Sequence, residues 1–125
     1  MTDDDMTDLA MRYFTALDAR DPDALARTLS EDCILTIETH DITHQGRAAI
    51  RELFATRWQG PLRAVHHGFT HSPSGSTGRI ASQFTVTYSG PDAPEPKSNA
   101  NVFSMQDGQI TKIAVYMAGA NSIKT

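Results

Sequence analysis

"KSNANVFSMQDGQITKIAVYMAG" (residues 97–119) has the pattern of two β-strands joined by a tight turn at Asp107-Gly108. Because side chains alternate along a strand, one face of the first strand should carry Asn99, Asn101, Phe103 and Met105. This row begins with two amides, and amides that face a core need hydrogen-bond partners. We therefore expect the amide end of this face to form the wall of a pocket.

Length and composition indicate one globular domain over residues 1–125, since 39% of the residues are hydrophobic and 21% are charged. The net charge of −4 and the scattered basic residues argue against a nucleic-acid partner. No apolar run is long enough for a membrane span, and the acidic start is unlike a secretion signal. The only cysteine, Cys33, excludes an internal disulfide and fits a reducing compartment. We expect a cytoplasmic protein in which Cys33 is an inert core thiol.

Hydrophobic spacing and turn residues predict the remaining elements. A helical stripe begins at Met6, and Asp21 followed by Pro22 marks the start of a second helix. The expected elements are helices over about 6–20, 22–29 and 46–58, strands over 33–39, 62–72 and 78–90, and the closing hairpin. The proline-rich residues 90–96 should form a loop. This order, α-α-β-α-β-β-β-β, indicates an α+β fold with helices on one face of a curved antiparallel sheet.

Three segments carry a family resemblance: "RYFTALDARDPDALARTLSEDC" (12–33), "GRAAIRELF" (46–54) and "NVFSMQDGQITKI" (101–113). Over roughly residues 6–118 the chain resembles the NTF2-like superfamily, in its ketosteroid-isomerase and SnoaL-like polyketide-cyclase branch. The resemblance implies a cone-shaped, cystatin-like fold in which the sheet wraps around the helices and encloses a cavity for a small apolar molecule. It also implies a homodimer formed through the outer sheet face, and chemistry that needs neither a cofactor nor a metal.

The resemblance also implies roles for individual residues. Tyr13 falls on the tyrosine that donates to the substrate oxyanion, and Asn101 falls on its partner, a protonated aspartate in ketosteroid isomerase. Ile37 stands where the isomerase has its general base, an aspartate. The neighbouring Glu38 is a candidate base if a bulge turns it inward.

Histidines are the other candidates for the base. In "HHGFTH" (66–71), regular alternation places His67 and Phe69 on one strand face and His66 on the other. A similar strand in dehydratase-like members of the superfamily favours His67. His40 belongs to an ionisable cluster in "ETHDITHQG" (38–46), a predicted loop whose spacing matches no metal signature.

Two functions remain open. The first is an enzyme that moves a proton in a small apolar carbonyl compound, by isomerisation, cyclisation or dehydration, with Tyr13 and Asn101 as oxyanion donors. The alternative is a ligand-binding or dimerisation module without catalysis. In both cases the expected pocket wall consists of Ile37, Trp58, Phe84, Asn99, Phe103 and Met117.

Overall fold

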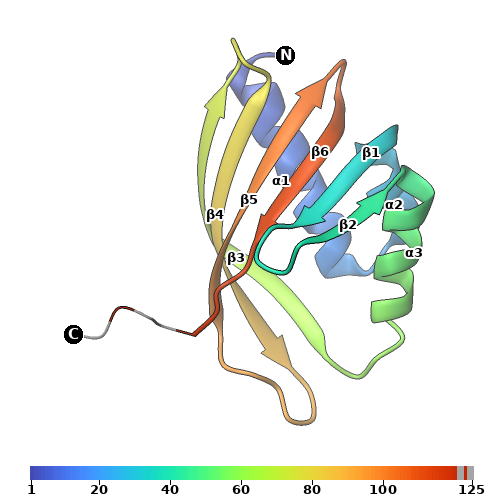
Figure 1. Cartoon of the computed structure of the whole chain (residues 1–125), viewed down its shortest axis with the longest axis vertical. Helices are drawn as coiled ribbons and strands as arrows, with labels where there is room; N and C mark the ends of the chain where they lie inside the picture. Colours follow the sequence, from blue (N-terminus) through green and yellow to red (C-terminus); the bar gives the residue numbers. More distant parts are fainter. Residues whose placement is uncertain (121–122, 124–125) are drawn as a thin grey trace.

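The computed structural model describes residues 1–120 and residue 123. These residues form three helices and six strands (Figure 1). The helices are α1 (Asp3–Ala19), α2 (Pro22–Thr28) and α3 (Arg47–Arg57). The strands are β1 (Leu29–Ile37), β2 (Ile42–Gln45), β3 (Arg63–Ser74), β4 (Arg79–Ser89), β5 (Lys97–Gln106) and β6 (Gln109–Tyr116). The predicted α+β class and element order are confirmed.

Local capping explains where the first two helices begin and end. Thr2 and Asp5 form a capping box at the start of α1, each side chain bonding to the other's backbone. Arg20 ends this helix in the left-handed region, with φ of 53°. The Asp21 carboxylate then accepts from the backbone N–H of Ala24 and starts α2. This short turn folds α2 back beside α1.

The six strands form one curved sheet in the order β2-β1-β6-β5-β4-β3. All neighbours are antiparallel except β1 and β6, which run parallel. The sheet curves over α1, while α2 and α3 lie beside β1 and β2 (Figure 1). Strand β2 lies within a stretch predicted as a loop, and its short, largely exposed sequence explains why alternation did not reveal it.

A β-bulge in β3 reverses the predicted facing of the histidines. His67 pairs with Thr85 but Thr70 pairs with Gln83, so β3 carries one extra residue at this point. Gly68 supplies the backbone turn, with φ of +66°. His66 and Phe69 therefore share the inner face, and the expectation that His67 and Phe69 share a face is wrong.

Apolar side chains of α1 and the sheet pack together in a core. Phe14 of α1 has its ring centroid 4.9 Å from that of Phe84 and 5.8 Å from that of Phe103. On β5, Asn99, Asn101, Phe103 and Met105 are all buried, as the alternation predicts. None of the helices within residues 1–120 is long and apolar enough to cross a membrane.

Candidate functional site

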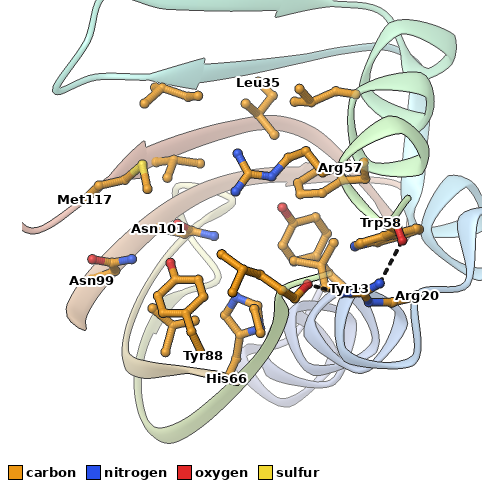
Figure 2. Close-up of a pocket in the computed structure, with 18 of the residues that line it drawn as sticks. Tyr13, Arg20, Leu35, Arg57, Trp58, His66, Tyr88, Asn99, Asn101 and Met117 are labelled. Atoms are coloured by element: carbon orange, nitrogen blue, oxygen red, sulfur yellow. Dashed lines mark hydrogen bonds between the residues drawn. The ribbon is translucent and has the colours of Figure 1, made fainter. Parts of the chain in front are cut away.

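A pocket of about 360 Å³ lies between α1, α3 and the inner face of the sheet (Figure 2). Its wall is mainly apolar, and α3, β1 and β4 contribute Leu53, Phe54, Leu35, Phe84 and Val86. The volume lies within the range typical of small-molecule sites. The polar side chains of the wall come from elements far apart in the sequence.

Tyr13 enters the pocket from α1 with its ring only 1% exposed. Edge-on contacts with Phe14 and Phe103, both at 5.3 Å between ring centroids, hold the ring. Burial raises the pKa of the Tyr13 hydroxyl above its ordinary value, and the nearby Cys33 thiol adds to this effect. The hydroxyl has no hydrogen-bond partner within the described residues. Tyr13 is therefore a protonated donor facing the pocket at neutral pH.

Asn101 reaches the same pocket from β5 (Figure 2). The residue is 3% exposed, and its Oδ1 is buried without a partner in the part of the chain that the structure describes. An unsatisfied buried acceptor typically costs about 1–3 kcal/mol. The neighbouring Asn99 differs, because its Oδ1 accepts a 2.8 Å hydrogen bond from the backbone N–H of Ala118.

His66 lines the pocket and is held by Asp18 at the end of α1. Its Nδ1 lies 2.6 Å from Oδ1 of Asp18, and its backbone N–H donates to both carboxylate oxygens, at 3.1 and 3.2 Å. The ring also contacts Phe14 and Phe84, with centroids 5.4 and 5.3 Å away. In the neutral ring, a proton on Nδ1 donates to the carboxylate and leaves Nε2 free to accept. The sequence did not predict the pairing of His66 with Asp18, because regular alternation along the strand does not account for the bulge that Gly68 permits.

The three predicted bases lie outside the pocket. His67 is exposed, and its Nε2 lies 2.7 Å from Oγ1 of Thr87. Glu38 is exposed and accepts a 2.7 Å hydrogen bond from Thr36, so no bulge turns it inward. His40 is exposed in the turn between β1 and β2. Among the described residues, no three His, Cys, Asp or Glu side chains lie together as metal ligands could.

Most of the expected wall residues do line the pocket, namely Ile37, Trp58, Phe84, Asn99 and Met117. Phe103 does not, because it is fully buried in the core behind Tyr13. Sequence reasoning missed Arg57 of α3 and Tyr88 of β4, which also line it. Alternation could have found Tyr88, since it lies on the face of β4 that Phe84 also occupies.

Arg20 fixes one edge of the pocket. Its guanidinium donates to the backbone carbonyl of Trp58 at 2.7 Å and to that of Leu62 (Figure 2). The segment between these carbonyls lines the pocket through Gly60 and Pro61. Arg20 therefore ties the end of α1 to the connection between α3 and β3.

Comparison with known proteins agrees with this architecture. The sequence profile of the SnoaL-like domain matches residues 10–113. The chain belongs to the SnoaL-like family. No curated protein matches the sequence of this SnoaL-like chain significantly.

Solved structures share the fold of this SnoaL-like protein at low sequence identity. A candidate polyketide cyclase from Xanthomonas campestris pv. campestris is 22% identical, with a TM-score of 0.80 over 91% of this chain and 90% of its own. A candidate ketosteroid isomerase from Kribbella flavida is 16% identical, with a TM-score of 0.74 over 98% and 84% of the two chains. A cystatin-like protein from Methylobium petroleophilum is 12% identical, with a TM-score of 0.80 over 98% and 81%. These likenesses establish the NTF2-like, cystatin-like fold.

The SnoaL-like pocket combines two donors with one acceptor. Tyr13 and the Asn101 amide can donate hydrogen bonds, and Nε2 of His66 can accept a proton. No Asp or Glu among the described residues lines the pocket, and apolar Ile37 lies in its wall. The arrangement is suited to a neutral ligand atom that gains negative charge, or to an anion.

Proposed function

We propose that this protein catalyses proton transfer in a small, largely apolar carbonyl compound, leading to isomerisation, cyclisation or dehydration. The base is His66, oriented by Asp18, and the oxyanion donors are Tyr13 and Asn101. The observation that carries the proposal is the 2.6 Å contact between His66 and Asp18 in the wall of the pocket that Tyr13 and Asn101 also line. Proton transfer of this kind requires no cofactor.

The chemistry begins at a carbon next to the substrate carbonyl. Nε2 of His66 takes a proton from this carbon, and the electrons of the broken C–H bond form an enolate whose charge rests on oxygen. The imidazolium is stabilised by the Asp18 carboxylate 2.6 Å away. In isomerisation the proton then returns to another carbon, and in dehydration it passes to the leaving hydroxyl. In cyclisation the enolate carbon forms a bond to a second carbonyl carbon of the substrate, and the proton passes to the resulting alkoxide. Each route regenerates the neutral ring.

The two donors lower the energy of the enolate. Tyr13 is protonated at neutral pH, burial raises its pKa further above the ordinary 10.0, and its hydroxyl has no competing partner within the described residues. Asn101 is likewise buried, and its amide donates at any pH. Each preorganised donor in such a site is typically worth about 3–4 kcal/mol of activation free energy.

Exchange of carbon-bound protons in D₂O tests the proposal without knowledge of the natural substrate. We would follow loss of the α-proton signal of 2-tetralone by NMR. The native chain should accelerate exchange, His66→Asn should slow it by about 10²–10⁴-fold, and Tyr13→Phe by about 10²–10³-fold. Exchange at the buffer rate with 2-tetralone and a panel of small ketones would favour a binding-only pocket.

His67→Asn is the matched control. It makes the same change one residue away, on the outer face of the sheet. Its exchange rate should equal that of the native chain. Equal losses in the two variants would show that the effect of His66→Asn is structural, as would a large fall in its melting temperature.

A further inference from the structure

Within the described residues, the charged side chains that line the pocket are the guanidinium groups of two arginines. Arg20 and Arg57 line it together with His66, whereas no acidic residue of the described chain does. The protein as a whole carries a net charge of −4. The pocket thus concentrates positive charge within an acidic protein, and low-dielectric walls focus the field of charges of one sign.

Of the two arginines that line the pocket, Arg57 is the one whose guanidinium makes no hydrogen bond or ion pair with the described residues. Arg20 donates to two backbone carbonyls, and Arg51, six residues before Arg57 on α3, is paired with Asp23 at 2.9 Å. Arg57 has neither an ion pair nor a side-chain hydrogen bond among the described residues. Asp18, whose carboxylate contacts the pocket-lining His66, is already committed to that histidine.

The Arg57 side chain extends from the last residue of α3 over the pocket, on the side away from His66 (Figure 2). Its aliphatic part joins the apolar wall, and its five N–H groups are free for a ligand. A planar guanidinium matches the two oxygens of a carboxylate. The aliphatic or aromatic part of such a ligand would pack against the apolar wall of the pocket below Arg57.

We infer that the ligand of this pocket carries a carboxylate, which Arg57 binds, in addition to the carbonyl that reacts near Tyr13, Asn101 and His66. The inference rests on the proposed function in one respect, namely that the substrate binds in this same pocket. Arg57 is a binding residue in this scheme. It selects carboxylated compounds over neutral ones of the same shape.

A matched pair of probes tests this inference by binding alone. We would titrate the native chain with 2-naphthoate and with 2-naphthamide by calorimetry, at pH 8 and low salt. Because Arg57 is exposed, the expected preference for naphthoate is modest, about tenfold, and should shrink as salt is added. Arg57→Gln should abolish the preference, and Arg57→Lys should retain part of it.

Arg79→Gln is the control, since Arg79 is an exposed arginine at the far end of β4 and does not line the pocket. It should keep the full preference. Equal binding of the two probes by the native chain, binding of neither, or a preference that survives in Arg57→Gln would overturn the inference. His66→Asn should keep the preference while losing proton exchange, so the two proposals fail separately.

Discussion

The carboxylate of Asp18 binds His66 twice, at the ring Nδ1 and at the backbone N–H. The two residues are 48 positions apart, on α1 and β3. The backbone contact fixes where the helix end lies on the strand, and the ring contact holds the imidazole in the pocket wall. One carboxylate thus couples the packing of α1 to the position of an imidazole in the pocket wall.

Asp18→Asn should slow the exchange reaction by up to about 10⁴-fold, the loss that follows when the carboxylate orienting a catalytic histidine becomes an amide. An amide can still bind the backbone N–H, but it cannot stabilise an imidazolium. The acid limb of the pH–rate profile, along which the base is lost to protonation, should therefore move to lower pH, which a purely structural change would not cause. The rate and the profile should be measured on 2-tetralone. A profile identical to that of the native chain would contradict this role.

Asn101→Leu should stabilise the protein while it impairs exchange. Leucine removes the buried Oδ1 that has no partner, a gain of about 1 kcal/mol in unfolding free energy. Asn99→Leu is the matched change two residues away, and it should destabilise the protein because Ala118 loses its acceptor. Urea denaturation of both variants checks the opposite signs. Destabilisation by Asn101→Leu would mean that Oδ1 of Asn101 has a hydrogen-bond partner in solution.

Gly68→Ala should destabilise the domain by about 1–2 kcal/mol, because alanine at φ of +66° is strained. The nearest atom to an added Cβ would be the Thr85 hydroxyl, at 3.8 Å, so the cost is conformational rather than steric. The strain would be relieved if the bulge were lost, which would rotate His66 out of the pocket. We therefore expect the rate of proton exchange to fall strongly even though the loss of unfolding free energy is small. Thermal unfolding and exchange rates, measured together, test this.

Alkaline pH should weaken the fold through two buried acids. Burial raises the pKa of Cys33 from 9.0 to about 12, and that of Tyr13 above its ordinary 10.0. Both groups release protons more readily in the unfolded chain, so the unfolding free energy should fall once pH exceeds about 9. Tyr13→Phe and Cys33→Ala should each reduce the slope of unfolding free energy against pH between 9 and 12. Unchanged slopes in both variants would contradict this assignment.

We expect a homodimer in solution, formed through the outer face of the sheet, as family resemblance implies. Val65 and Tyr116 lie on this face and are 51% and 45% exposed. Sedimentation velocity should give a dimer for the native chain and a monomer for a Val65→Arg, Tyr116→Arg double variant. A native monomer at micromolar concentration would refute the expectation.

Much of the fold follows from local patterns. Helical spacing from Met6, the Asp21-Pro22 start and alternation along residues 97–106 predicted the element order and the buried row from Asn99 to Met105. These features depend on residues close in sequence, whose periodicity reports directly on a buried face. Most of the residues predicted to form the pocket wall line the pocket for the same reason.

Only the tertiary structure decided which ionisable groups meet. A single extra residue at Gly68 reversed strand parity, so His66 faces the pocket and His67 faces outward. Asp18 became the partner of His66 through packing of a helix end on a strand. Alternation is a local property that one bulge can reset, whereas contacts between distant residues arise only when helix and sheet pack together.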